Sequence, residues 1–300
     1  MTRWLRTIVV LVVVVLALGA GWVWLRGVLD RMTLLPGCSA TALGTTAVLD
    51  PEQSGNAAVI AAVAVDRGLP GRAATIGIAT ALQESKLRNV DYGDRDSVGL
   101  FQQRPSQGWG TAAQIMDPVY ATNAFYDVLV KIEGYQSLPI TKAAQKVQRS
   151  AFPSAYAAHE TEARAFASAL SGYSEAALTC RLREPEGLAR EAADAGGLTA
   201  RSRAVITAAT AETGRTGAAA PAGEDDAAGT AVRFALTGAE STRMSWALAQ
   251  WAVARANGLN VVAVEVGGRR WQRDHSKDGW TRFEAAPPAG TVIVRVAAGG

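Results

Sequence analysis

Hydrophobic residues form a continuous run near the start of the chain and later recur at regular spacing. Residues 8–25 contain no charged side chain, and as a helix they would be about 27 Å long, close to the thickness of a bilayer's hydrocarbon core. Trp22 and Trp24 lie near the end of this run, where indole rings favour the membrane interface. The run predicts a transmembrane anchor at 8–25; a cleaved signal peptide is the alternative.

Helical periodicity dominates the region from residue 50 to residue 175. Apolar positions recur at helical spacing over 52–67 and 72–85. Asp117-Pro118 is typical of a helix start, because aspartate caps free amides and proline is tolerated at the first helical position. Helices are also predicted over residues 117–134, 141–150 and 154–170.

Strand-like alternation is found in the C-terminal third. The stretches 259–266 and 291–296 alternate like strands, and an apolar helix over 244–257 carries Trp246 and Trp251. Residues 213–230 are low in complexity. The C-terminal part is therefore predicted to be a small α+β domain.

The expected fold class is an N-terminal transmembrane helix, a mostly α lysozyme-like domain and a small α+β C-terminal domain. The expected order is a cytoplasmic tail (1–7), the anchor (8–25), a stalk (26–49), the mostly α domain (50–180), a linker (181–197) and the α+β domain (198–300).

Composition excludes several functional classes. The formal net charge of +3 is too small and too dispersed to favour a nucleic-acid partner. With His159 and His275 as the only histidines, a histidine metal cluster is excluded, and so is a Ser-His-Asp triad in the first domain. We expect no cofactor and no bound metal.

The two cysteines, Cys38 and Cys180, bracket the predicted helical domain. Such a pair predicts a disulfide in a domain outside the reducing cytosol. The alternative is a lipid-modified Cys38, because Leu34-Leu35-Pro36-Gly37-Cys38 loosely resembles a lipoprotein box. With the apolar run, the disulfide predicts a single-pass protein of the cell membrane whose C-terminal bulk is extracytoplasmic.

Glu84 is the first candidate for chemistry, because it closes the predicted helix 72–85 among small apolar residues. Protonating a glycosidic oxygen requires a carboxylic acid whose pKa is raised by partial burial, typically to about 6. Downstream, Gly99 permits close backbone approach, Leu100 and Phe101 are expected to wall a cleft, and Gln102 is expected to bind sugar hydroxyl or N-acetyl groups.

Together, Glu84-Ser85 and Gly99-Leu100-Phe101-Gln102 resemble the Glu-Ser…Gly-Leu-Met-Gln signature of soluble lytic transglycosylases and goose-type lysozymes. The string continuing from Gln103 to Gly110 is similar to a lysozyme-like group of actinobacterial cell-wall proteins. The resemblance spans roughly residues 50–175. It implies that Glu84 is the general acid/base and that the substrate-binding residues are Ser85, Gly99, Leu100, Phe101, Gln102 and Gln103.

The sequence departs from this family downstream. The later Ala-Tyr-Asn-Ala-Gly motif is not present, and Gln148 is the candidate to replace its asparagine. A second carboxylate for direct hydrolysis could come from Asp91, Asp94 or Asp96, which also fit a solvated turn. Aromatic residues that could either stack on sugars or belong to the core are Trp109, Tyr120 and Tyr126.

The C-terminal domain resembles the zinc D-Ala-D-Ala carboxypeptidase and hedgehog fold, with its metal ligands replaced. Asp226 stands in place of a histidine, Arg233 in place of an aspartate, and the terminal segment 291–294 has no histidine. Without imidazole ligands such a site should not hold Zn²⁺. We therefore expect a degenerate, non-catalytic module.

The sequence thus predicts a membrane-anchored enzyme that cleaves peptidoglycan glycan strands, as a lytic transglycosylase or a muramidase. Its expected partners are those strands and, through residues 8–25, the membrane. The alternative is a non-catalytic wall-binding scaffold, or a subunit of a secretion or conjugation apparatus.

Overall fold

The computed structural model describes residues 35–148, 155–220, 229–285 and 287–300, together with residues 4, 13, 16–19, 21 and 22. It divides the chain into Met1–Pro36 and the compact unit Gly37–Gly300. Most of the predicted anchor at 8–25 lies outside the described residues. Among the residues that are described, no helix is long and apolar enough to cross a bilayer.

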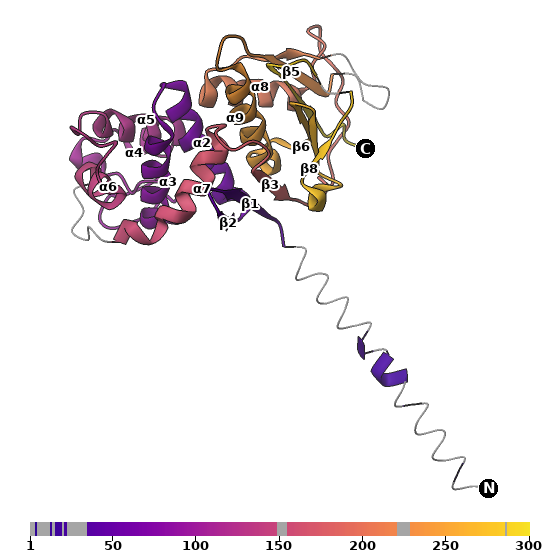
Figure 1. Cartoon of the computed structure of the whole chain (residues 1–300), viewed down its shortest axis with the longest axis horizontal. Helices are drawn as coiled ribbons and strands as arrows, with labels where there is room; N and C mark the ends of the chain where they lie inside the picture. Colours follow the sequence, from indigo (N-terminus) through magenta and orange to yellow (C-terminus); the bar gives the residue numbers. More distant parts are fainter. Residues whose placement is uncertain are drawn as a thin grey trace. The chain divides into compact units, whose positions relative to one another are not determined.

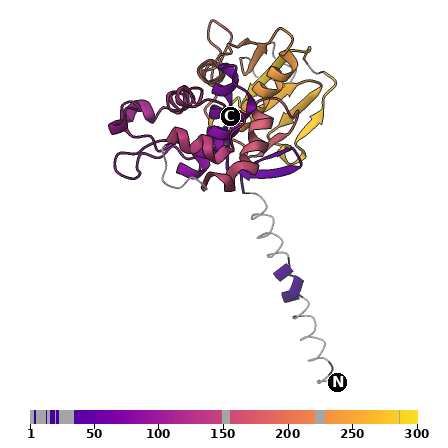
Figure 2. The ribbon, with the colours of Figure 1, turned by 60° about the vertical axis from the view of Figure 1, so that its left-hand side comes forward.

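The first half of the compact unit is built from helices, shown in indigo to magenta in Figures 1 and 2. Asp50 begins α2 with a capping box, in which its side chain accepts from the Gln53 amide and the Gln53 side chain accepts from the Asp50 amide. The helices are α2 (Pro51–Asp66), α3 (Gly71–Ser85), α4 (Ala112–Ile115), α5 (Pro118–Leu129), α6 (Ile140–Gln148) and α7 (Glu160–Leu170). These helices confirm the predicted periodicity, although α5 ends earlier than expected, at Leu129.

A three-stranded antiparallel sheet accompanies these helices. It consists of β1 (Gly37–Ala42), β2 (Thr45–Leu49) and β3 (Leu178–Arg181) in the order β2-β1-β3. The prediction of a mostly α domain is therefore wrong, and residues 37–49 form strands instead of a stalk. The strands escaped the sequence analysis because β1 alternates among small residues, Gly-Cys-Ser-Ala-Thr-Ala, whose hydrophobic contrast is weak.

The predicted disulfide between Cys38 and Cys180 is confirmed. The two residues lie opposite each other in the β1–β3 pair, and both are fully buried. The bridge closes a sequence separation of 142 residues, so it joins the first strand of the compact unit to the strand that follows the helices.

The C-terminal half contains a six-stranded antiparallel sheet in the order β4-β5-β9-β6-β7-β8. Its strands are β4 (Ala218–Ala219), β5 (Ala231–Ala235), β6 (Val261–Val266), β7 (Arg269–Gln272), β8 (Trp280–Arg282) and β9 (Thr291–Val296). The helices α8 (Ala200–Thr213) and α9 (Ser241–Ala254) lie beside it, in orange in Figure 1. One face of the sheet is covered by α9, where Trp246 meets Trp280 edge-on with ring centroids 5.3 Å apart. The strands predicted at 259–266 and 291–296 are both present.

A buried glutamine connects the two halves. Gln250 of α9 is fully buried, and its amide nitrogen donates to the carbonyls of Ala169 and Ser174 at 2.7 and 2.9 Å. Its carbonyl oxygen accepts from the backbone amides of Ala177 and Leu178 at 2.9 and 2.8 Å. Because one side chain satisfies four backbone groups, it fixes α9 against the segment that leads from α7 into β3.

Replacing both Cys38 and Cys180 by serine should lower the free energy of unfolding by up to about 5 kcal/mol, because the bridge restricts a long loop in the unfolded chain. Urea denaturation of the variant and of the native protein, with and without reductant, measures this loss. The reduced native protein should match the variant. Identical curves in all four samples would show that the bridge does not contribute to stability.

Candidate functional site

Glu84 lies one residue before the end of α3 and is half-buried. The phenol of Tyr156 donates a hydrogen bond to its Oε1 at 2.5 Å. Tyr156 is only 1% exposed and belongs to the short 3-10 helix Ala155–His159, which packs against α3. A buried donor thus fixes one carboxylate oxygen of Glu84.

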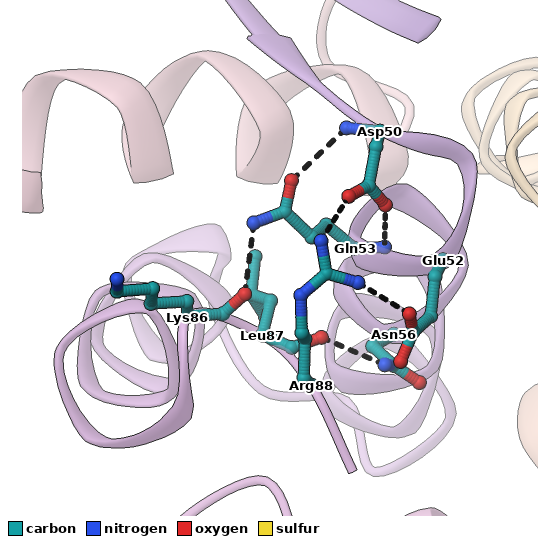
Figure 3. Close-up of polar contacts among 7 residues, drawn as sticks. All are labelled: Asp50, Glu52, Gln53, Asn56, Lys86, Leu87 and Arg88. Atoms are coloured by element: carbon teal, nitrogen blue, oxygen red, sulfur yellow. Dashed lines mark hydrogen bonds and ion pairs between the residues drawn. The ribbon is translucent and has the colours of Figure 1, made fainter. Parts of the chain in front are cut away.

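The turn that follows α3 is stabilised by the first turns of α2 (Figure 3). Lys86 and Leu87 have φ values of 56° and 57°, in the left-handed region that is unfavourable for residues with a Cβ. The amide of Gln53 donates to the Lys86 carbonyl at 2.9 Å, and that of Asn56 donates to the Leu87 carbonyl at 2.7 Å. These contacts determine where α3 ends, and therefore where Glu84 lies.

Arg88 adds a second connection to the same region. Its guanidinium forms ion pairs with Asp50 and Glu52, on either side of the start of α2. The Asp50 carboxylate, through its hydrogen bond, is the main cause of a raised pKa for Arg88. Asp50, which caps α2, therefore also binds Arg88 in the segment that follows α3.

The segment 98–103 forms a tight turn beside Glu84. The backbones of Val98 and Gln103 pair in both directions, at 3.0 and 3.1 Å. Gly99 has a φ of 78°, and a Cβ on it would lie 2.8 Å from the Ile115 carbonyl oxygen, so this position requires glycine. The Ser85 hydroxyl donates to the Leu100 carbonyl at 2.7 Å, which joins the turn to α3.

Gln148 completes the cluster from the end of α6. Its side-chain amide donates to the Phe101 carbonyl at 2.6 Å. Gln148 also lines a pocket of about 160 Å³ together with Gln107, Gly108, Trp109, Val128 and Val147. The structure thus brings together the predicted residues Glu84, Ser85, Gly99 and Gln148.

The side chains of the turn do not all face solvent. Leu100 and Phe101 are fully buried, and Phe101 stacks on Phe125 with ring centroids 4.6 Å apart. Gln103 is 1% exposed, and its amide donates to the Ala121 carbonyl at 3.1 Å. Gln102, by contrast, is partly exposed and only weakly held, with its amide 3.3 Å from the carbonyls of Tyr92 and Gly99. Of the predicted binding residues on the turn, Gln102 is therefore the one whose side chain can reach a ligand.

The acidic loop before the turn is organised by Asp96. Its carboxylate accepts from Arg104 at 2.9 Å and from the Ser106 amide at 2.7 Å. The Arg104 hydrogen bond, followed by those from Ser106, holds the pKa of Asp96 well below its usual range. Asp91 and Asp94 are exposed. Asp96 is thus a structural anion of the loop.

The aromatic candidates have different roles. Tyr126 is fully buried and its hydroxyl donates to the Ile60 carbonyl at 2.9 Å, so it belongs to the core. Burial raises the pKa of this phenol far above its ordinary value. Trp109 is partly exposed at the pocket that Gln148 lines, and Tyr120 is partly buried with its hydroxyl end beside Gly110.

The described positions that were compared with a zinc site lie on two paired strands of the second sheet, where Arg233 of β5 is opposite Ile293 of β9. Arg233 is exposed on β5, and residues 291–294 lie within the buried strand β9. Asp225 and Asp226 lie outside the described residues. Within the described part of the chain, no three His, Cys, Asp or Glu residues are grouped as metal ligands would be. His275 is an exposed neighbour of Asp274.

The sequence matches no protein-family model and no curated protein. The resemblance to lytic transglycosylases therefore stays a prediction, based on the motif residues and on the geometry around Glu84.

Sequence reasoning missed Tyr156, Gln53 and Asn56. Tyr156 lies 72 positions from Glu84, and no local pattern indicates such a contact. Gln53 did carry a signal, because Asp50 followed three residues later by glutamine is a capping-box pattern. What the pattern does not reveal is that the same glutamine also binds the Lys86 carbonyl.

Replacing Asn56 by alanine should lower the free energy of unfolding by about 1–3 kcal/mol, because the buried Leu87 carbonyl loses its partner. Urea denaturation measures this change. Gln136→Ala, at an exposed amide side chain of the same half, is the control and should change stability by less than about 0.5 kcal/mol. Equal stabilities for the two variants would contradict the assigned role of Asn56.

Proposed function

We propose that the chain cleaves the glycan strands of peptidoglycan and that Glu84 is its general acid and base. The observation that carries the proposal is the half-buried carboxyl group at the end of α3, hydrogen-bonded by buried Tyr156 and fixed beside the Gly99 turn. Tyr156 positions one oxygen, so the orientation of the other is restricted. A carboxyl group restricted in this way, with partly exposed Gln102 on the turn that Ser85 holds, suits proton transfer to a sugar oxygen.

In the proposed reaction, protonated Glu84 gives its proton to the oxygen that leaves the anomeric carbon. The bond between that carbon and oxygen breaks, and positive charge develops on the sugar ring. The ionised Glu84 then removes a proton from the nucleophilic hydroxyl that attacks the anomeric carbon. A new carbon–oxygen bond forms, the first proton leaves with the departing sugar hydroxyl, and the proton taken from the nucleophile restores protonated Glu84, so the cycle closes with one carboxyl group.

The acidic loop supports an internal nucleophile over water. Direct hydrolysis uses a second carboxylate to activate water or to attack the sugar. Asp96 is engaged by Arg104 and Ser106, while Asp91 and Asp94 extend into solvent. Attack by the sugar's own 6-hydroxyl then yields 1,6-anhydro ends, as in the lytic transglycosylases that the motif resembles.

The proposed location is the outer face of the cell membrane. A buried disulfide persists in oxidising compartments, so the compact unit that contains Cys38–Cys180 belongs outside the cytosol. The uncharged run 8–25 supports attachment to the membrane.

One observation favours the non-catalytic alternative, a module that binds cell wall without cutting it. Leu100 and Phe101, expected to wall a cleft, are packed in the core, and the pocket beside Gln148 is smaller than the roughly 300–1,000 Å³ of common ligand sites. A wall-binding scaffold would retain peptidoglycan binding without turnover. The experiment on Glu84 separates the two functions.

Replacing Glu84 by glutamine should leave the fold intact and lower glycan cleavage by at least ~10²-fold, because an amide cannot donate the proton. Mass spectrometry of the sugar ends released from purified peptidoglycan measures turnover and identifies anhydro or reducing products. Glu133→Gln, an exposed glutamate of the same half, is the matched control and should cleave like the native protein. Cleavage by the Glu84 variant at the native rate would refute its role; no cleavage by the native protein would favour the scaffold.

Replacing Tyr156 by phenylalanine should lower kcat by about 10-fold or more with little change in KM, because it removes a hydrogen bond to a charged group and leaves the substrate contacts in place. Tyr173→Phe, at an exposed tyrosine, is the control. Steady-state kinetics and thermal denaturation should be measured together. A fall in melting temperature with unchanged kcat would assign Tyr156 a purely structural role.

A further inference from the structure

A pocket of about 410 Å³ lies at the end of α3 opposite Glu84. Its walls come from the first turn of α3, from α7, from the turn between β1 and β2, and from the segment that follows α7. Its volume falls within the roughly 300–1,000 Å³ of common ligand sites. The pocket shares no residue with the one beside Gln148.

Two arginines give this pocket a positive charge. Arg72 belongs to the first turn of α3, and Arg164 belongs to α7, which packs against α3. Arg164 is exposed and forms no ion pair with any residue in the described part of the chain. Among the described residues that line the pocket, none is acidic. The charge of the two guanidinium groups is therefore not neutralised within the pocket.

The guanidinium of Arg72 is incompletely hydrogen-bonded. One of its terminal nitrogens donates to the Leu138 carbonyl. Its Nε is buried and has no hydrogen-bond partner among the described residues. A guanidinium carries five donors in a planar fork that fits the oxygens of a phosphate group. A phosphate has enough acceptor oxygens, and enough negative charge, to bind both arginines.

Leu43 provides an apolar wall in an unfavourable backbone conformation. Ala42 pairs with Thr45, so Leu43 and Gly44 are the central residues of the turn between β1 and β2, with φ values of 54° and 75°. Such turns favour asparagine or glycine at these positions, and a leucine there is strained. The Leu43 side chain is also 64% exposed. Neither the turn geometry nor burial favours leucine here, whereas an apolar ligand group in the pocket would.

Tyr173 adds an aromatic surface that is held in place. A Cβ on Gly71 would lie 3.2 Å from the Tyr173 ring, so glycine allows the ring to lie against the first turn of α3. The guanidinium of Arg243 lies over the same ring, 4.9 Å from its centroid. The tyrosine is 59% exposed, so part of its surface is open to a ligand.

We propose that this pocket binds a phosphate ester that carries an apolar group. The phosphate is bound by Arg72 and Arg164, and the apolar group lies against Leu43 and Tyr173. A membrane phospholipid has this chemistry, and so does a soluble ester such as phenyl phosphate. The pocket shares no residue with the cluster around Glu84, so this binding is a second function, independent of the proposed glycan cleavage.

Dibutyroyl phosphatidylglycerol, phenyl phosphate and glycerol phosphate test the proposal by calorimetric titration of the full chain in a non-ionic detergent. At least one of the two apolar esters should bind about 10-fold more tightly than glycerol phosphate, because burial of its apolar group adds to phosphate recognition. Tighter binding of the phospholipid identifies a lipid as the source, and tighter binding of phenyl phosphate identifies a soluble ester. Equal affinities for all three ligands, or no binding of either apolar ester, would overturn the proposal.

Leu43→Asn separates ligand binding from folding, because asparagine tolerates the left-handed conformation better than leucine does. The variant should be at least as stable as the native protein to thermal denaturation. Its affinity for the apolar esters should fall to that for glycerol phosphate. Val48→Thr, at an exposed position of β2 outside the pocket, is the control and should bind all three ligands normally.

Arg164→Gln tests the phosphate contact and should weaken binding of all three ligands about 10-fold, because one charged donor group is lost. Arg181→Gln is the control, since Arg181 is exposed on β3 opposite Gly37, at the other end of β1 from Leu43. This control and Glu84→Gln should both bind normally. Native affinities in either the Leu43 or the Arg164 variant would refute the assignment.

Discussion

The arrangement around Glu84 depends on how the chain leaves α3. Lys86 and Leu87 are consecutive left-handed residues with side chains, a conformation that costs about 1–2 kcal/mol per residue. Hydrogen bonds from Gln53 and Asn56 to their carbonyls offset that cost. Because α2 itself begins at the capping box of Asp50, the position of Glu84 is fixed by an interaction at the start of another helix.

Side-chain hydrogen bonds to backbone carbonyls also hold the Gly99 turn, which follows α3 in the chain. Ser85 and Gln148 donate to the carbonyls of Leu100 and Phe101, whose side chains are packed in the core. The turn is therefore held in two ways: the side chains of Leu100 and Phe101 pack in the core, and Ser85 of α3 and Gln148 of α6 hydrogen-bond its carbonyls.

Sequence patterns predicted the elements whose signal is local. The Asp117-Pro118 start of α5, the periodicity of α2 and α3, and the alternation of β6 and β9 are all local signals. The strands β1 and β3 were missed because β1 consists of small residues, β3 has only four residues, and their pairing joins Cys38 to Cys180 across the whole helical region. Glu84, Ser85 and Gln148 were identified as candidates, but the burial of Leu100 and Phe101 follows from packing on Phe125, which a motif does not encode.

These burials change how the Gly-Leu-Phe-Gln segment would act on a glycan. With Leu100 and Phe101 in the core and their carbonyls occupied, the proposed contact with a sugar would fall to Gln102, Glu84 and the pocket that Trp109 and Gln148 line. Gln102 has a φ of 48° and is held through long hydrogen bonds, so its side chain can exchange those partners for a ligand at small cost. In the proposed site, the segment would therefore position the weakly held Gln102 amide, while Tyr156 holds the Glu84 carboxyl group.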